Sequence, residues 1–223
     1  MNEHGKISAS MMCADPFYLS DILRTLEMAG VEYLHQDVMD GKFVPNLGMA
    51  LDHMKILRAN TPIPFDFHLL VMEPENVIPL LSPTPSDIIS IHYESTLQVQ
   101  RTLECARRYG AKVFLAINPA TPLNVLEETI HYVDGVNLLM VNPGFFGQKA
   151  VASCFDKAAR LCEFIKASGC LDVEVEVDGN ITCENARRLK SLGASIFVAG
   201  TSSIFKNHVV DARDIASFRD SIR

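Results

Sequence analysis

The chain has 223 residues, 48% of them hydrophobic and 21% charged, and its formal net charge is −7. This length suits one sizeable core, and the acidic surplus argues against a nucleic acid as the main partner, because phosphate backbones attract Lys and Arg. The polar first residues and the lack of any apolar run of about 18 residues predict a cytoplasmic protein without a secretory leader or membrane span.

Short apolar runs of strand length alternate with longer amphipathic stretches along the chain. The runs predict strands at residues 7–12, 33–39, 65–71, 88–92, 112–117, 135–141, 173–177 and 195–199. The amphipathic stretches predict helices that include residues 18–29, 97–109, 123–132, 150–167 and 183–192. Eight strands alternating with helices favour a closed (β/α)₈ barrel over an open doubly wound sheet. We therefore expect one α/β domain that comprises residues 1–223.

Histidine and aspartate residues stand near the ends of three expected strands. His35 and Asp37 are two apart and share one face of the second strand, while His68 lies in the third and Asp178 ends the seventh. Taken alone, each has an ordinary explanation: a hydrogen-bonded pair, a core histidine or a turn. Barrel enzymes, however, place their chemistry at the carboxyl ends of the strands, and two carboxylates buried there without a cation would be costly. Together these residues predict an N₂O₂ site for a divalent metal.

Two turns rich in backbone N–H donors follow the sixth and eighth expected strands. The first is Gly144-Phe145-Phe146-Gly147, and the second is Gly200-Thr201-Ser202. Glycines let backbone N–H groups approach an anion closely, and hydroxyls and a helix start add further donors. Barrels often bind phosphate near the loops after strands seven and eight, where Gly179-Asn180 also lies. The sequence therefore predicts a phosphate site at this rim.

These residues resemble a known family, the ribulose-phosphate 3-epimerases and their hexulose-phosphate relatives. The longest match is His35-x-Asp37-x-Met39-Asp40-Gly41-x-Phe43-Val44-Pro45-Asn46. Further motifs follow in the expected order: His68-Leu69-x-Val71, His92-x-Glu94, Asn118-Pro119-Ala120-Thr121-Pro122, Val141-Asn142-Pro143-Gly144-Phe145-x-Gly147-Gln148 and Val177-Asp178-Gly179. The resemblance runs from Ile7 to the last expected helix.

The resemblance implies a TIM barrel of the ribulose-phosphate-binding type that holds one divalent metal through His35, Asp37, His68 and Asp178. It also implies that Asp37 and Asp178 act as acid and base on opposite faces of the substrate. The implied substrate contacts are Ser10, Met39, His68, Gly144, Phe145, Phe146, Gly147, Gly179, Asn180, Gly200, Thr201 and Ser202. Zinc is the first choice of metal, with iron, manganese and cobalt as alternatives. The partner would be a small-molecule sugar phosphate, and the protein a homo-oligomer.

The implied reaction is the 3-epimerisation of D-ribulose 5-phosphate to D-xylulose 5-phosphate through a metal-stabilised enediolate. The nearest alternative substrate is D-allulose 6-phosphate. Asn180 and the Gly200-Thr201-Ser202 turn resemble the hexose branch, whereas Asn142 resembles the pentose branch. A sugar-phosphate lyase or decarboxylase is disfavoured, because no central strand ends in a lysine. A non-catalytic phosphate-binding module is the remaining alternative.

Some residues depart from the family pattern. Leu70 and Leu139 stand where methionines are usual, Phe146 replaces a small residue, and Asn180 replaces a glycine. None of these changes removes an expected metal ligand or base, so they bear on the choice of substrate.

The sequence gives alternative interpretations for two further pairs of ionisable residues. His92 and Glu94 either orient the metal ligands or serve only the fold. Glu174 and Glu176 are expected to face outward or to reach other polar groups, with no assigned role.

Overall fold

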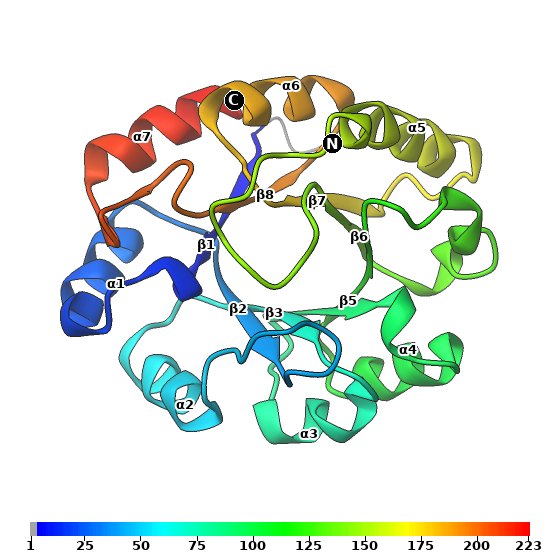
Figure 1. Ribbon diagram of the computed structural model, residues 1–223, viewed down its shortest axis with the longest axis horizontal. Helices are drawn as coiled ribbons and strands as arrows, with labels where there is room; N and C mark the ends of the chain where they lie inside the picture. Colours follow the sequence, from blue (N-terminus) through cyan, green and yellow to red (C-terminus); the bar gives the residue numbers. More distant parts are fainter. Residues whose placement is uncertain (1–3) are drawn as a thin grey trace.

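The computed structural model describes residues 4–223, which form a closed barrel of eight strands in the order β1 to β8 (Figure 1). The barrel strands are β1 (Lys6–Ser10), β2 (Tyr33–Met39), β3 (Phe65–Leu70), β4 (Ile88–His92), β5 (Lys112–Ile117), β6 (Gly135–Leu139), β7 (Glu174–Asp178) and β8 (Ile196–Ala199). Each strand pairs in parallel with its neighbours, and β1 pairs with β8 to close the ring. The predicted (β/α)₈ barrel is confirmed.

Helices surround the barrel on its outside (Figure 1). They are α1 (Leu19–Met28), α2 (Leu51–Asn60), α3 (Ile78–Leu81), α4 (Val99–Arg107), α5 (Ser153–Ala167), α6 (Cys183–Leu192) and α7 (Ala212–Ser221). Short 3₁₀ turns are η1 (Met11–Cys13), η2 (Pro16–Tyr18), η3 (Pro74–Asn76) and η4 (Tyr93–Ser95), and β9 (Phe205–Lys206) pairs with β10 (Val209–Val210) in a hairpin. Within residues 4–223, no helix is both long and apolar enough to cross a membrane.

The α-helix expected at residues 123–132 is wrong. This segment instead forms two 3₁₀ turns, η5 (Leu123–Leu126) and η6 (Ile130–Tyr132). β-Branched and aromatic residues lose rotamer freedom in a helix, and the Thr129 hydroxyl bonds back to the carbonyls of Val125 and Leu126. The link from β5 to β6 therefore lacks the α-helix found after the other strands.

Two strands end two residues earlier than expected, and both changes shape the barrel mouth. β1 stops at Ser10, so that Met11–Cys13 turns into a 3₁₀ helix. β6 stops at Leu139, and the segment that follows crosses in front of the barrel opening before α5 begins (Figure 1). Both segments therefore belong to the rim at the carboxyl ends of the strands.

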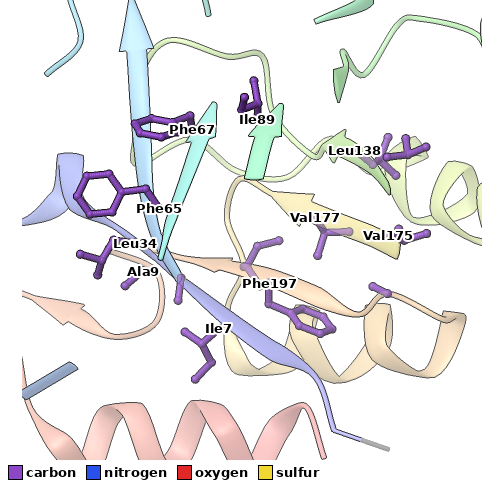
Figure 2. Close-up of a cluster of buried hydrophobic side chains, with 14 of the residues drawn as sticks. Ile7, Ala9, Leu34, Phe65, Phe67, Ile89, Leu138, Val175, Val177 and Phe197 are labelled. Atoms are coloured by element: carbon purple, nitrogen blue, oxygen red, sulfur yellow. The ribbon is translucent and has the colours of Figure 1, made fainter. Parts of the chain in front are cut away.

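The outward faces of the strands pack against the helices in one hydrophobic cluster. Alternate strand residues take part, as the period of two requires, and buried residues of all seven helices α1 to α7 belong to the cluster. Figure 2 shows part of it, including Ile7, Ala9, Phe65, Phe67, Val175 and Val177. Burying each large side chain contributes roughly 1.5–3 kcal/mol relative to its exposure, so this cluster is the main support of the barrel.

The inside of the barrel is apolar towards the amino ends of the strands and polar above. Tyr33, Ile88, Phe114 and Ile196 form a small inner cluster. Further along the strands, the inward residues Ser8, Asp66, Ser90, Asn137 and Glu176 are fully buried. At the amino-terminal rim Glu174 forms ion pairs with Lys6 and Lys112. The chemistry of the interior is therefore concentrated towards the carboxyl ends.

Gly135 on β6 lies opposite Phe114 on β5, and a Cβ at Gly135 would lie 2.5 Å from the Phe114 ring. We predict that Gly135→Ala lowers the free energy of unfolding by about 1–3 kcal/mol, because the ring must move in a filled interior. Urea denaturation would measure this change. In a Phe114→Leu background the same substitution should cost less, and an unchanged midpoint for Gly135→Ala alone would contradict the prediction.

Candidate active site

Four ionisable side chains from three strands meet at the floor of the barrel mouth. β2 carries His35 and Asp37, β3 carries His68 opposite Asp37 in the strand register, and β7 ends with Asp178. His68 Nδ1 lies 3.4 Å from Asp37 Oδ1 and 3.4 Å from Asp178 Oδ2. His35 Nε2 lies 3.5 Å from Asp37 Oδ1 and 3.8 Å from Asp178 Oδ2. The four donor atoms all lie within 4.8 Å of one another.

Burial and charge act in opposite directions on these groups. Burial lowers the pKa of His35, but Asp66 and Asp37 outweigh it and raise the pKa well above the ordinary value. Burial likewise opposes the protonated form of His68, and its contacts with Asp178 and Asp37 raise its pKa. Burial would raise the pKa of Asp37, but His35 and His68 hold it far below the ordinary range. The carboxylates thus favour positive charge between them.

The donor set fits a divalent cation. His35 Nε2 and His68 Nδ1 are buried and make no hydrogen bond to any described residue. Both nitrogens face the carboxylates of Asp37 and Asp178. Two imidazole nitrogens and two carboxylates at this spacing are a ligand set that zinc and similar metals accept.

Each of the two histidines has a buried partner on its other ring nitrogen. His35 Nδ1 lies 2.6 Å from Asp66 Oδ2, which also accepts a 2.7 Å hydrogen bond from the Ser8 hydroxyl. His68 Nε2 lies 2.9 Å from His92 Nε2. Such contacts fix the ring orientation of a ligand. The sequence interpretation missed Asp66, although it stands two residues before His68 and therefore shares its face of β3.

The outward orientation considered for Glu176 is wrong. Its side chain is fully buried inside the barrel, because it stands two residues before the inward-facing Asp178. Burial, and then the charge of Asp66, raise the pKa of Glu176 well above its ordinary value. Asp66 Oδ2 in turn accepts the hydrogen bond from Ser8 and lies 2.6 Å from His35 Nδ1. Glu174 reaches other polar groups, which was the alternative expectation, because it forms ion pairs with Lys6 and Lys112.

A cavity at the mouth is lined by every residue that the sequence assigned to substrate contact: Ser10, Met39, His68, Gly144, Phe145, Phe146, Gly147, Gly179, Asn180, Gly200, Thr201 and Ser202. Asp37 and Asp178 also line it, while His35 is fully buried behind them. Leu70 and Leu139 line it where the family usually has methionines. The sequence interpretation missed Cys13, whose thiol lies 3.7 Å from the Ser10 hydroxyl, because nothing in its pattern distinguishes it from a core cysteine.

Asn180 connects the three donor-rich turns at one end of the cavity. Its side-chain oxygen accepts a 3.2 Å hydrogen bond from the backbone N–H of Ala150, in the segment after β6. Its side-chain nitrogen donates a 3.0 Å hydrogen bond to the Ser202 hydroxyl, in the turn after β8. Asn180 adopts a left-handed conformation with φ of 54°, which asparagine tolerates better than most residues. This residue therefore holds the turns in register with one another.

Gly179, beside Asn180, permits the close approach of β6 and β7 at this rim. Its φ is 105°, and a Cβ there would lie 2.5 Å from Val141 Cγ2. Both the conformation and the contact exclude a larger side chain. Asp178 is thereby followed by a turn that can bend sharply without crowding the cavity.

The segment after β6 forms the outer wall of the cavity. Phe145 and Phe146 are both about half exposed there. Gln148 Nε2 donates hydrogen bonds of 2.6 Å to the Asn142 carbonyl and 2.9 Å to the Phe145 carbonyl, which fold the segment upon itself. The Phe146 ring meets His208 of the β9–β10 hairpin edge to face, with centroids 6.0 Å apart. The aromatic wall therefore reaches across to the β8 side of the mouth.

Comparison with known sequences finds one family. Residues 6–205 match the sequence model of the "Ribulose-phosphate 3 epimerase family". The chain is 34% identical to the ribulose-phosphate 3-epimerase of Bacillus subtilis (strain 168), over 88% of this chain and 91% of that protein. It is 37% identical to the ribulose-phosphate 3-epimerase of Buchnera aphidicola subsp. Acyrthosiphon pisum (strain APS), over 90% and 87%. The chloroplastic ribulose-5-phosphate-3-epimerase of Arabidopsis thaliana is 36% identical, over 88% and 70%.

Comparison with solved structures finds other barrels. KGPDC from Streptococcus mutans has a TM-score of 0.68 and 11% identity, with 98% of this chain and 97% of that chain covered. Phosphoribosyl anthranilate isomerase from Thermus thermophilus has a TM-score of 0.65 and 18% identity, with 97% of each chain covered. At these identities the likeness shows the shared fold alone.

We predict that Glu176 lowers stability as the pH rises above about 4.5. Because its folded-state pKa is raised above the ordinary 4.5, its contribution to the free energy of unfolding is greatest below pH 4.5 and falls as the pH rises towards the folded pKa. Glu176→Gln needs no proton and should remove this fall. Relative to wild type, the variant should therefore gain about 1–3 kcal/mol between pH 5 and pH 8. Denaturant unfolding in the presence of a chelator would measure it, and parallel pH profiles would contradict it.

Proposed function

This chain belongs to the ribulose-phosphate 3-epimerase family, and we propose that it converts D-ribulose 5-phosphate to D-xylulose 5-phosphate. The enzyme is then a carbohydrate epimerase of the isomerase class. The observation that carries the proposal is the placement of two carboxylates, Asp37 and Asp178, each 3.4 Å from the same His68 nitrogen at the floor of the cavity. Donor-rich turns at the rim complete a site that suits a phosphorylated ketose.

The substrate phosphate binds where the three turns converge. Backbone N–H groups of Gly144–Gly147, Gly179–Asn180 and Gly200–Ser202 supply the donors, and the rigid link through Asn180 spares the cost of ordering these turns when substrate arrives. The sugar then extends from the phosphate towards Asp37 and Asp178. Ser10 and Met39 line this path.

The chemistry asked of the chain is the inversion of one carbon next to a ketone. The C–H proton at C3 is removed on one face, which leaves an enediolate, and a proton is returned on the other face. Asp37 and Asp178 are the two proton-transfer groups, one for each face. In the reverse direction their roles exchange. With one carboxylate on each side, inversion needs no rotation of the intermediate within the site.

One divalent cation would be held by His35, Asp37, His68 and Asp178. When bound, it supplies positive charge at the substrate oxygens on which negative charge develops. Zinc is the first choice, and iron, manganese or cobalt would suit the same ligands. Ser10 donates a 3.5 Å hydrogen bond to Asp37 Oδ2, which holds this carboxylate in place for both of its tasks.

A ketohexose phosphate is the second candidate substrate. The observation in its favour is the hydrogen bond from Asn180 to Ser202, which unites two features that resemble the hexose branch. D-Allulose 6-phosphate would need the same ligands and the same pair of aspartates. The two candidates therefore differ in chain length and not in mechanism.

Proton NMR in deuterated buffer tests this function. Metal-loaded wild type should convert D-ribulose 5-phosphate with deuterium entering at C3, and should do so with at least about tenfold higher kcat/KM than D-allulose 6-phosphate. Asp37→Asn and Asp178→Asn should each lower kcat by about 10²–10⁴-fold, and each should exchange C3 of only one of the two epimers.

Metal content, measured by mass spectrometry, is the control for the two variants, because both aspartates belong to the proposed metal set. Exchange of both epimers by each variant would refute the two-base scheme. Preference for the hexose phosphate would overturn the substrate alone, and absence of any exchange by metal-loaded wild type would overturn the epimerase assignment.

Metal binding should weaken as the pH falls. His35 and His68 must be neutral to bind a cation, and the pKa of each is raised above its ordinary 6.5. Protons therefore compete already above pH 6.5, and each proton displaced lowers the apparent affinity by about tenfold per pH unit. Competition with a chelating dye between pH 8 and pH 6 would measure this dependence. An affinity that is constant over this range would contradict it.

A further inference from the structure

His68 is backed by a second imidazole, whereas His35 is backed by a carboxylate. His92, at the end of β4, is fully buried and does not line the cavity. Its Nε2 lies 2.9 Å from His68 Nε2, and the two rings are inclined by only 24°. The 2.9 Å separation is that of a hydrogen bond between the two ring nitrogens. Phe43 covers the His92 ring, with centroids 4.7 Å apart.

Glu94 is the next side chain in this hydrogen-bonded row, after His92. Its Oε2 lies 3.0 Å from His92 Nδ1. Its Oε1 accepts a 2.9 Å hydrogen bond from the backbone N–H of Asn118 and a further one from the Thr121 hydroxyl, both after β5. A carboxylate that already accepts two donors on one oxygen accepts on the other, so His92 Nδ1 is the donor to Glu94.

The direction of the hydrogen bond from His92 to Glu94 determines which ring nitrogens of His92 and His68 carry protons. His92 carries its proton on Nδ1, so its Nε2 presents a lone pair to His68. His68 then carries its proton on Nε2 and donates it to His92. The consequence is that His68 Nδ1, the atom that faces Asp37 and Asp178, keeps its lone pair free.

We propose that Glu94 and His92 are positioning residues that fix the tautomer of neutral His68, so that its Nδ1 is presented as the metal-binding atom. This inference rests on the metal site of the proposed function. Neither residue touches the substrate or the cavity; both act through His68. The hydrogen-bonded row Glu94, His92 and His68, here called the relay, also connects β3 to the turn after β5, where Asn118 and Thr121 donate to Glu94.

Lys157 offers a matched control, because it anchors the same turn without entering the relay. It is almost fully buried on α5, and its Nζ donates hydrogen bonds of 2.7 Å to the Asn118 carbonyl and 3.3 Å to the Pro119 carbonyl. Lys157→Met removes these two hydrogen bonds and a charge that interacts with Glu94, but it changes no atom of Glu94, His92 or His68.

Glu94→Gln is the diagnostic substitution. The amide oxygen must keep the donors from Asn118 and Thr121, so the amide NH₂ is turned towards His92 Nδ1. His92 must then accept at Nδ1 and carry its proton on Nε2, which in turn moves the His68 proton to Nδ1. The opposite amide orientation would set NH₂ against the Asn118 N–H. Glu94→Gln keeps the shape of the side chain and lies two hydrogen bonds away from the metal site. It would nevertheless leave a proton on His68 Nδ1, so that this atom could not bind a cation.

The test combines zinc affinity with the histidine tautomers. Zinc binding is measured by competition with a chelating dye, and the tautomers are read by ¹⁵N NMR of histidine-labelled protein loaded with zinc. We expect about tenfold to hundredfold weaker binding for Glu94→Gln and near wild-type binding for Lys157→Met. In wild type, His92 should carry its proton on Nδ1 and His68 on Nε2. If Glu94→Gln does not fold, the tautomers seen in the wild-type spectrum still test the proposal.

The outcomes separate this proposal from the function. Wild type that binds zinc with His92 protonated on Nε2 would overturn the relay alone, as would a Glu94→Gln variant with unchanged affinity. Equal loss in Lys157→Met and Glu94→Gln would also overturn it, because loosening of the turn would then explain both. Wild type that binds no zinc would overturn the relay and the metal site together.

Discussion

The burial of ionisable groups inside a closed barrel is the constraint on which the site depends. Asp66 and Glu176 are fully buried inside the barrel, and Asp37 and Asp178 project into the floor of the cavity above them. A charge in such a place must find a partner or change its protonation state. These groups differ in how they meet this constraint. Asp66 accepts from Ser8 and His35, burial raises the pKa of Glu176, and Asp37 and Asp178 lie around two imidazoles.

This constraint links the barrel interior to the chemistry at its mouth. Each imidazole that faces Asp37 and Asp178 is held from behind, His35 by Asp66 directly and His68 by Glu94 through His92. The supporting residues stand on β3 and β4 or just beyond, so the register of the barrel sets the directions of the ligands. Rigid strands with buried hydrogen-bonded partners hold such groups more precisely than loops do.

The rim shows how departures from a family pattern are absorbed. Asn180, in place of a glycine, adopts the left-handed conformation and uses its side chain to join the turns after β6 and β8. Phe146, in place of a small residue, adds an aromatic wall that reaches His208. Neither change touches the four clustered ligands. The site can therefore keep one mechanism while its outer end adjusts to a substrate.

The sequence by itself determined the eight strands and the residues that gather at their ends, because periodic apolar runs define strands and polar residues at strand tips stand out. Parity along a strand could also have revealed Asp66 and Glu176, each two residues before a ligand. The tertiary structure alone decided the rest. That Glu94 reaches Asn118 and Thr121, or that Asn180 reaches Ser202, depends on contacts between segments distant in the chain. The turns at 123–132 were likewise decided by competing local hydrogen bonds that no apolar period records.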